Sequence, residues 1–219
     1  MSAFLLAIEG ADGAGKATVS AAIVEQLQAG GKRAEVISFP RYAETAGGFA
    51  LGEFLAGRLP RTVSPRAAAV LYALDRLESR DHLLAAMAVN DVVVFDRYIA
   101  SNMAYQGAQV PRAKSAALIE WIADLETRGF ALPGPDLSVY LDTPQDVARA
   151  LIARKRRRSY TDDAFDAYEA DVALQARVRE NYAAMAAEGL LGRWATVATT
   201  AEGVSRAPDA VAADVVALL

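Results

Sequence analysis

The segment from Gly10 to Thr18, which reads Gly-Ala-Asp-Gly-Ala-Gly-Lys-Ala-Thr, constrains the fold of this chain more than any other. It lies between an apolar run (Phe4 to Ile8) and an apolar-periodic stretch that begins near Val19. This context predicts a strand, a phosphate-binding loop and a helix, in that order. Glycines let backbone N–H groups surround an anion, and the helix N-terminus adds partial positive charge. We therefore expect the loop to bind the phosphates of a nucleoside triphosphate, through Gly10, Gly13, Ala14, Gly15, Lys16, Ala17 and Thr18.

Position 17 departs from the usual form of such a loop. A serine or threonine normally follows the lysine and ligates Mg²⁺, but Ala17 has no oxygen. Thr18 lies about 100° further round the helix and is poorly placed to replace that hydroxyl. Two other interpretations are a glycine-rich turn that binds nothing and a dinucleotide loop, which would need glycine at Thr18. The flanking strand and helix favour the phosphate-binding loop.

Composition narrows the class of protein. The chain has 219 residues, is 53% hydrophobic and shows no internal repeat, so we expect a single α/β domain over residues 1–219. It has no cysteine, which excludes disulfides and thiolate metal sites. The apolar run near the N-terminus is too short to span a bilayer, and we expect a cytoplasmic protein. A net charge of −4 argues against nucleic acid or an anionic membrane as a partner.

Apolar strands alternate with helical patterns along the chain. Strands are expected at residues 4–8, 34–38, 91–95, 136–141 and 194–198, with a long helix from Pro65 and further helices at 114–128 and after Pro144. Such alternation predicts parallel βαβ units whose sheet is covered on both faces. Ligands of these sheets bind beyond the carboxyl ends of the strands.

Two polar segments follow predicted strands and join the loop at that edge. Phe39-Pro40-Arg41-Tyr42 reads either as a base-stacking ring beside a phosphate-binding arginine or as a turn with one core aromatic. Asp96-Arg97 follows the most apolar strand, where two charges are costly unless they act on each other or on a ligand. The convergence of three polar segments predicts a cleft for two substrates.

Two charged segments allow more than one interpretation. The pair Asp75-Arg76 interrupts an apolar helix and is, by itself, most simply a surface ion pair. The run from Arg154 to Arg158 reads as a solvated helix end, a polyanion patch or an arginine-rich clamp over phosphates. In a phosphate-handling protein the clamp is favoured, and it predicts a lid at about residues 154–165.

With these residues in view, the chain resembles the thymidylate kinases, P-loop enzymes that phosphorylate thymidine monophosphate with ATP. The resemblance rests on Ile8 to Lys16, Phe39-Pro40-Arg41-Tyr42, Asp96 to Asn102 and Asp166-Ala167-Tyr168-Glu169. It implies the P-loop NTPase fold, with a five-stranded parallel sheet in the order 2-3-1-4-5 and helices on both faces. It also implies Mg²⁺ as a cofactor, thymidine monophosphate and ATP as substrates, and a homodimer.

The resemblance also implies a role for each matching position. On the acceptor side, Phe39 stacks on thymine, Arg76 reaches a thymine carbonyl, Asn102 lies near the base, Tyr105 crowds the sugar 2′ position, Arg97 and Tyr42 face the phosphate, and Asp166 and Glu169 close over the site. Asp12 lies near the sugar 3′-hydroxyl and the metal, and Asp96 lies beneath the phosphates. Without a loop hydroxyl, Mg²⁺ is expected to be held through Asp12 and Asp96.

The implied reaction is in-line attack of an acceptor phosphate oxygen on the γ-phosphorus, so catalysis depends on holding two polyanions and neutralising their charge. The neutralising positive charge is expected from Lys16, Mg²⁺ and Arg97. The lid adds further positive charge through Arg154, Arg156, Arg157 and Arg158. Some family members place an arginine in the loop, where this chain has Gly13, so here the lid is expected to supply it.

Three alternatives stay open at this point. One is a related kinase for deoxyuridine or purine monophosphates, which would differ only in the base pocket. Another is a P-loop protein that binds nucleotide for regulation, suggested by Ala17. A nucleic-acid-binding module at residues 154–158 is opposed by the acidic whole.

Overall fold

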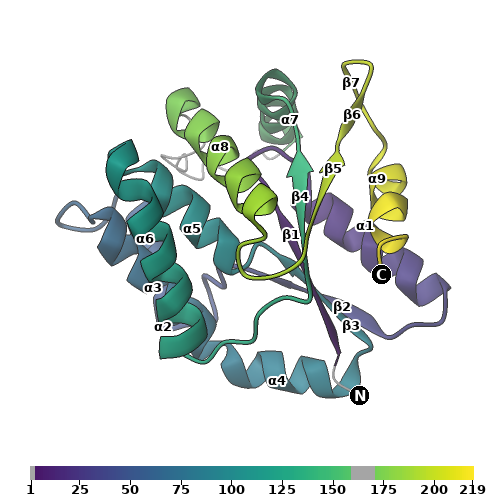
Figure 1. Ribbon diagram of the computed structural model, residues 1–219, viewed down its shortest axis with the longest axis horizontal. Helices are drawn as coiled ribbons and strands as arrows, with labels where there is room; N and C mark the ends of the chain where they lie inside the picture. The colour runs from purple at the N-terminus through teal and green to yellow at the C-terminus, as the bar shows by residue number, and fades with distance from the viewer. Residues whose placement is uncertain (1–2, 159–170) are drawn as a thin grey trace.

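The computed structural model describes residues 3–158 and 171–219. Within residues 154–158 it describes the backbone alone. Its main sheet has five parallel strands, β1 (Phe4–Glu9), β2 (Ala34–Ser38), β3 (Val92–Asp96), β4 (Leu137–Asp142) and β5 (Trp194–Ala198). Their order across the sheet is β2-β3-β1-β4-β5, which confirms the predicted topology. Figure 1 shows this sheet running through the middle of the molecule.

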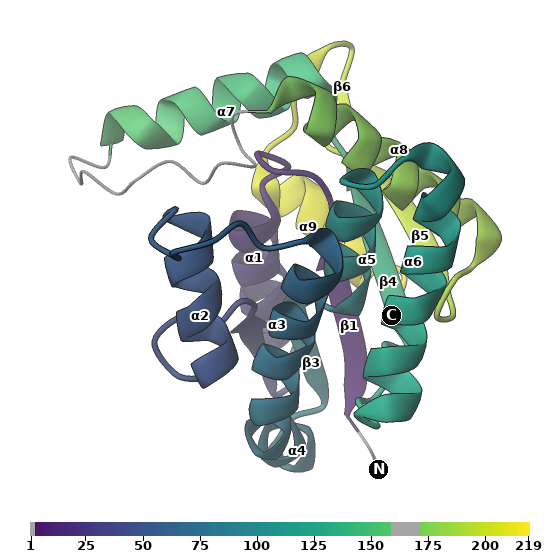
Figure 2. The ribbon, with the colours of Figure 1, turned by 90° about the vertical axis from the view of Figure 1, so that its left-hand side faces the viewer.

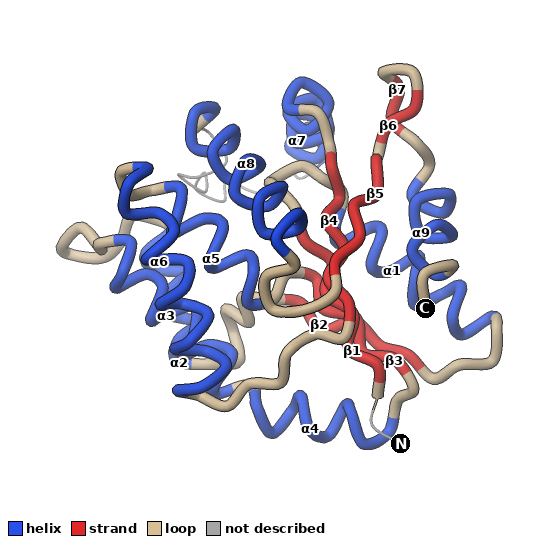
Figure 3. The backbone as a smooth tube through the Cα atoms, viewed as in Figure 1, coloured by secondary structure: helices blue, strands red, loops and turns tan. Residues whose placement is uncertain are grey.

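Helices cover both faces of the sheet (Figures 1 and 3). On one face of the sheet, Leu6 and Ile8 of β1 pack against α1 and α9. On the opposite face, Leu5 and Ala7 pack against the core formed with α5, α6 and α8. Because both faces are buried, β1 is apolar at every position up to its last. The helices are α1 (Lys16–Ala29), α2 (Ala46–Leu55), α3 (Pro65–Glu78), α4 (Arg80–Val89), α5 (Ile99–Ala108), α6 (Arg112–Asp124), α7 (Gln145–Arg158), α8 (Val172–Glu188) and α9 (Pro208–Val216).

Two helices differ from the sequence prediction for identifiable reasons. The helix that begins at Pro65 divides at Ser79, whose hydroxyl donates to the carbonyl of Asp75 at 2.8 Å. Such back-bonding competes with the regular helical ladder and favours a bend. The predicted helix over 114–128 begins at Arg112 and ends in a π-helix, η1 (Leu125–Gly129), where the Phe130 N–H donates to Leu125 O at 2.9 Å. A small hairpin, β6 (Thr200–Ala201) with β7 (Val204–Ser205), was not predicted.

The loops that follow β1, β2 and β3 lie at one edge of the sheet, as parallel strands require. Figure 2 shows α7 extending across that end of the molecule, above α1 and α2. Among the described residues, no helix has the length and apolar character needed to cross a membrane.

Candidate active site

The loop between β1 and α1 has the backbone conformation of a phosphate-binding loop. Gly10, Gly13 and Gly15 all have positive φ, and Lys16 opens α1. A Cβ on Gly13 would lie 2.4 Å from the carbonyl oxygen of Ala148 in α7. The helix therefore passes directly over the loop and leaves no room for a side chain at position 13, where some family members are expected to have an arginine.

Lys16 is folded back onto this loop and is 6% exposed. Its Nζ donates to the carbonyl oxygens of Gly10 at 2.9 Å and Ala11 at 2.8 Å. Burial, followed by the positive charge of Arg97, lowers the pKa of Lys16 to about 8, despite the opposing effect of nearby carboxylates. The amino group is thus buried inside the loop, and this burial disfavours its protonated form.

The residue that directly follows Lys16 in the first turn of α1 is Ala17, which has no hydroxyl, and the hydroxyl of the next residue, Thr18, is on an exposed side chain. Within the part of the chain that the structure describes, no three histidine or acidic side chains are grouped to hold a metal ion. Any metal bound here therefore needs oxygen ligands from the substrates or from water as well as from the protein.

Asp12 and Arg97 form an ion pair between the loop and the end of β3. Arg97 donates to Oδ1 of Asp12 and also to Ser101 Oγ at 3.1 Å. Burial alone would raise the pKa of Asp12, but the charges of Arg97 and Lys16 outweigh it and the pKa is lowered. Arg97 itself has φ 67°, a left-handed conformation that is uncommon outside glycine.

Gln175, on α8, fixes Asp12 from the other side. Its Nε2 donates to Oδ2 of Asp12 at 2.7 Å, and its Oε1 accepts from the Asp12 N–H at 3.1 Å. Sequence reasoning missed this residue, because an uncharged glutamine in an amphipathic helix gives no signal of its own.

A cavity of about 180 Å³ opens beside this ion pair. It brings together the predicted acceptor-side residues other than Asp166 and Glu169, which lie outside the described residues, and it adds Tyr72, which was not predicted. Its lining comprises Asp12, Phe39, Pro40, Tyr42, Tyr72, Arg76, Arg97, Ser101, Asn102 and Tyr105.

Aromatic rings form much of the cavity wall. Phe39 is 4% exposed and packs against Phe95 and Tyr98, with ring centroids 6.4 and 6.0 Å away, and the Phe39–Pro40 peptide bond is cis. The ring of Tyr105 lies 5.3 Å from the Arg97 guanidinium carbon. Burial, and then the negative charge of Asp12, raises the pKa of Tyr105 well above its usual value, so its hydroxyl stays protonated.

Arg76 is buried and lines the cavity, so the surface ion pair that the adjacent charges Asp75-Arg76 suggest by themselves does not form. Its guanidinium donates to Glu126 on η1, from Nε to Oε2 at 2.5 Å and from NH2 to Oε1 at 2.7 Å. Asp75 instead accepts from the backbone N–H of Arg41 and the hydroxyl of Thr45. Adjacent helical residues point about 100° apart, so Asp75 and Arg76 face different partners.

Asn102 shares the same carboxylate. Its Nδ2 donates to Glu126 Oε1 at 2.8 Å and to Ala69 O at 3.0 Å. Its Oδ1 is buried and has no protein partner among the described residues.

Glu9, the last residue of β1, is fully buried below the site. Its Oε1 accepts from the Tyr98 N–H at 2.8 Å and its Oε2 from the Tyr182 hydroxyl at 2.9 Å. Burial raises the pKa of Glu9, although these two hydrogen bonds oppose the shift. An acidic residue that ends a buried strand is a signal that sequence reasoning passed over. Asp96, at the end of the neighbouring β3, is half-buried.

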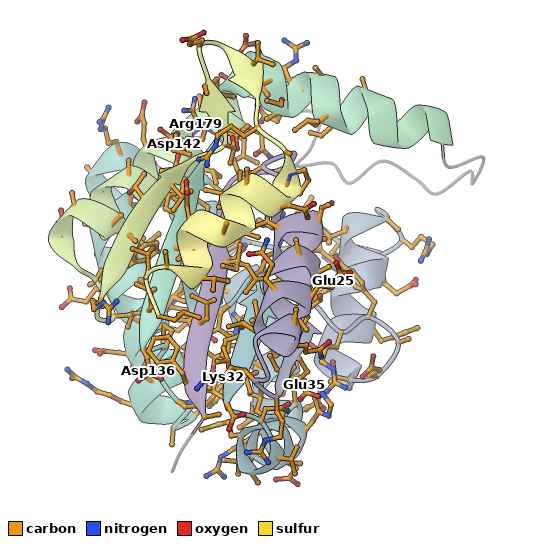
Figure 4. The ribbon with its side chains drawn as sticks, turned by 90° about the vertical axis from the view of Figure 1, so that its right-hand side faces the viewer. Glu25, Lys32, Glu35, Asp136, Asp142 and Arg179 are labelled. Carbon is orange, nitrogen blue, oxygen red and sulfur yellow. The ribbon has the colours of Figure 1, made fainter. Side chains whose placement is uncertain are left out.

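A second, mostly apolar cavity of about 450 Å³ lies between α7, α8 and the loop residues Ala11 and Asp12. One wall includes Arg179, which pairs with Asp142 at the end of β4 at 2.9 Å. Figure 4 shows these two side chains together beside α7. The predicted lid and closing residues cannot be placed here, since the side chains of Arg154, Arg156, Arg157 and Arg158 and the residues Asp166 and Glu169 lie outside the described part.

Comparison with known proteins agrees with this geometry. A family model described as thymidylate kinase matches residues 8–205. Thymidylate kinase from Mycobacterium tuberculosis is 36% identical over 196 residues, which cover 88% of this chain and 90% of that protein. A probable thymidylate kinase from Archaeoglobus fulgidus is 33% identical over 156 residues, or 71% of this chain and 72% of that protein.

The fold is also shared with a solved structure. Thymidylate kinase from Candida albicans superposes with a TM-score of 0.72 at 22% identity, covering 99% of this chain and 91% of the other. At that identity the likeness supports the fold alone, the P-loop NTPase fold. The family match and the curated relatives together establish that this chain belongs to the thymidylate kinase family.

Proposed function

We propose that the 180 Å³ cavity binds thymidine monophosphate during the ATP-dependent phosphorylation that defines the thymidylate kinase family. The observation that carries this assignment is the buried, unpartnered Oδ1 of Asn102 on the cavity wall. A buried acceptor is costly unless a ligand supplies a donor. The N3–H of thymine is such a donor, and the buried ring of Phe39 provides a surface for the base.

The phosphate end of the acceptor is assigned to Arg97 and Tyr42. Arg97 is held between Asp12 and Ser101, and an arginine fork suits a phosphate better than a point charge does. Tyr105 lies against the Arg97 guanidinium and would crowd the sugar between base and phosphate. This arrangement supports a deoxyribonucleotide over a ribonucleotide.

The triphosphate of ATP is assigned to the loop from Gly10 to Thr18. Its glycines and the start of α1 suit an anion, and Lys16 lies within the loop. An incoming phosphate would replace the two carbonyl oxygens that Lys16 now contacts. The reaction then depends on holding donor and acceptor in line while Lys16 and Arg97 neutralise charge.

Mg²⁺ is the cofactor that this chemistry implies, and the donor set fits it. Mg²⁺ prefers one or two carboxylates together with phosphate oxygens and water. Asp12, within the loop, and Asp96, at the end of β3, supply the carboxylates, and a carboxylate oxygen that accepts one hydrogen bond retains a further lone pair. When bound, Mg²⁺ would screen the negative charge of the phosphates.

The chain is proposed to act as one domain in the cytoplasm and as a homodimer. Val70 on α3 is exposed, and Leu74 and Leu77 are half-buried along the same helix, which supports a subunit contact there. On α6, in contrast, Leu118 and Ile122 are buried in the core and are not available to a partner. Light scattering on the purified chain tests the dimer.

The decisive test is a coupled assay of ADP formation from ATP and Mg²⁺, with thymidine, deoxyuridine, uridine, cytidine and guanosine monophosphates at equal concentration. Strong preference for thymidine monophosphate is expected. Equal rates with purine monophosphates would refute the base-pocket assignment. Failure of every acceptor while ATP still binds would favour a regulatory nucleotide-binding role, as Ala17 suggests.

A further inference from the structure

The structure assigns to Glu126 the role of a positioning residue through which the base pocket selects thymine over cytosine, an inference that rests on the proposed function. Glu126 lies in η1 and is fully buried. Its carboxylate contacts both Arg76 and Asn102, the two polar side chains assigned to the base. Glu126 does not line the cavity, so it acts through these two side chains.

Two hydrogen bonds fix the orientation of the Asn102 side-chain amide. An asparagine amide nitrogen has two N–H donors, and here both are used by Glu126 Oε1 and Ala69 O. The nitrogen must face these two acceptors, so the Oδ1 atom is fixed on the opposite side of the amide plane. Oδ1 can only accept, and no described protein group donates to it. A base bound beside it must therefore present an N–H.

This requirement separates the pyrimidines. Thymine and uracil have an N–H at position 3 of the ring, whereas neutral cytosine has a bare nitrogen there. A cytosine would place two acceptors against each other and leave both unsatisfied. Sites built around a fixed hydrogen bond discriminate strongly, because the wrong ligand leaves buried polar groups unpaired.

Arg76 adds the same preference at the neighbouring ring position. Glu126 engages the guanidinium through Nε and NH2, which leaves donors on the remaining nitrogen. The guanidinium carbon lies 5.8 Å from the centroid of Phe39, the proposed stacking ring. A donor at that place suits the 4-carbonyl of thymine and opposes the 4-amino group of cytosine.

The backbone around Glu126 is irregular and is anchored by its own hydrogen bond. Glu126 occurs in a π-helical turn, an irregularity that is found frequently at functional sites. Its own carbonyl accepts from the Leu132 N–H at 3.0 Å, so the turn is tied to the following loop. Arg76 and Glu126 are 2% and 0% exposed in their side chains, and removing either charge leaves the other buried without its partner.

The test compares kcat/KM for thymidine and deoxycytidine monophosphates in the wild type, Glu126→Gln and Asp124→Asn. Glu126→Gln keeps the shape but replaces one carboxylate oxygen by an N–H₂ group. At Oε1 this group would oppose the Asn102 amide and free it to reverse, and at Oε2 it would oppose the Nε–H of Arg76. We expect the thymidine-to-deoxycytidine ratio to fall about tenfold or more. Asp124, an exposed acid two residues earlier, pairs only with Arg128 among the described residues, and its substitution should leave the ratio unchanged.

Using a ratio protects the test against a folding defect, because both substrates are measured on the same active fraction. A double-mutant cycle adds a second readout: in an Asn102→Ala background, Glu126→Gln should change the ratio by much less than it does alone. A Glu126→Gln protein that loses activity or stability but keeps the wild-type ratio would overturn the inference. If the wild type itself does not prefer thymidine monophosphate, the proposed function fails first, independently of Glu126.

Discussion

The guanidinium of Arg97 donates a hydrogen bond to Oδ1 of Asp12, although the two residues are 85 positions apart in the chain. The contact exists because β1 and β3 are parallel neighbours, so the residues that follow them meet at one edge. Lys16 lies on the same side and adds its charge to that of Arg97. The candidate phosphate sites for the two substrates are therefore joined by one network of charges before either substrate binds.

Asp12→Asn tests the carboxylate route for the metal. The variant keeps the size of the side chain but removes its charge, so the Mg²⁺ concentration for half-maximal turnover should rise about tenfold or more. Because the pKa of Asp12 is lowered, its ion pair is present above the unfolded value of 3.8 and is lost only as the pH falls below that value. Metal titrations near neutral pH are thus free of Asp12 protonation.

The matched control for that titration is Glu25→Gln. Glu25 is an exposed acid on α1, away from the loop (Figure 4). If both variants require the same Mg²⁺ concentration as the wild type, Asp12 is not a ligand.

Lys16 should make the stability of the nucleotide-free protein depend on pH. Its folded pKa is about 8, below the ordinary lysine value of 10.5, so the unfolded chain binds the proton more tightly between these values. Stability therefore rises with pH from about 8 to 10.5, by about 3 kcal/mol in total. Urea unfolding at several pH values should show this rise in the wild type and not in Lys16→Met. Parallel pH profiles for the two proteins would contradict it.

Ala17→Ser would restore the hydroxyl that the loop lacks. Position 17 is exposed in the first turn of α1, so serine fits without repacking. We expect the half-saturating Mg²⁺ concentration to fall by roughly fivefold, the ratio that about 1 kcal/mol of binding free energy produces. Ala21→Ser, at another exposed position of α1, controls for the weaker helix propensity of serine. An unchanged metal requirement would mean that position 17 does not face the metal.

Gly13→Ala tests the close approach of α7 to the loop. The new Cβ would meet the Ala148 carbonyl at 2.4 Å, and φ is +79°. We expect kcat/KM for ATP to fall sharply and the protein to lose about 1–3 kcal/mol of stability. Gly31→Ala shares the same backbone strain, at φ +80°, but meets no atom within 4 Å. The two variants should therefore differ in ATP kinetics, and an equal effect would argue that only backbone strain matters.

Signals close together in the chain predicted the strands and the polar segments that follow them, whereas the sheet order and the base-side residues of the cavity wall were implied by the resemblance to the thymidylate kinases. Asp96 and Arg97 stand out as charges at the end of an apolar strand, and the glycines of the loop have a fixed spacing. Parallel topology then brings such strand ends to one edge.

The partners of these residues were not predictable in the same way. Arg76 binds Glu126, which is 50 positions away, whereas the adjacent charges in the sequence paired Arg76 with Asp75. Glu126 occupies one position of an amphipathic helix pattern, and nothing in that pattern shows that the helix widens into a π-turn there. Such contacts depend on how α3, α5 and η1 pack, which apolar periodicity does not specify.

Glu9 supports the turn that presents Arg97. The carboxylate accepts from the N–H of Tyr98, the residue after Arg97, whose φ of 67° requires support from its surroundings. Glu9→Ala removes the acceptor of both the Tyr98 N–H and the Tyr182 hydroxyl, so it should destabilise the protein by at least about 2 kcal/mol. It should also raise KM for thymidine monophosphate more than KM for ATP.

Glu9→Gln separates the hydrogen bond from the charge. It retains an acceptor for Tyr98, so steady-state kinetics with each substrate varied in turn should be close to those of the wild type. Because burial raises the pKa of Glu9, the ionised carboxylate costs stability as the pH rises through that pKa. Glu9→Gln should therefore gain stability relative to the wild type as the pH rises above 4.5, the ordinary pKa of glutamate. If Glu9→Gln were instead as inactive as Glu9→Ala, the negative charge of Glu9 would itself be required for catalysis.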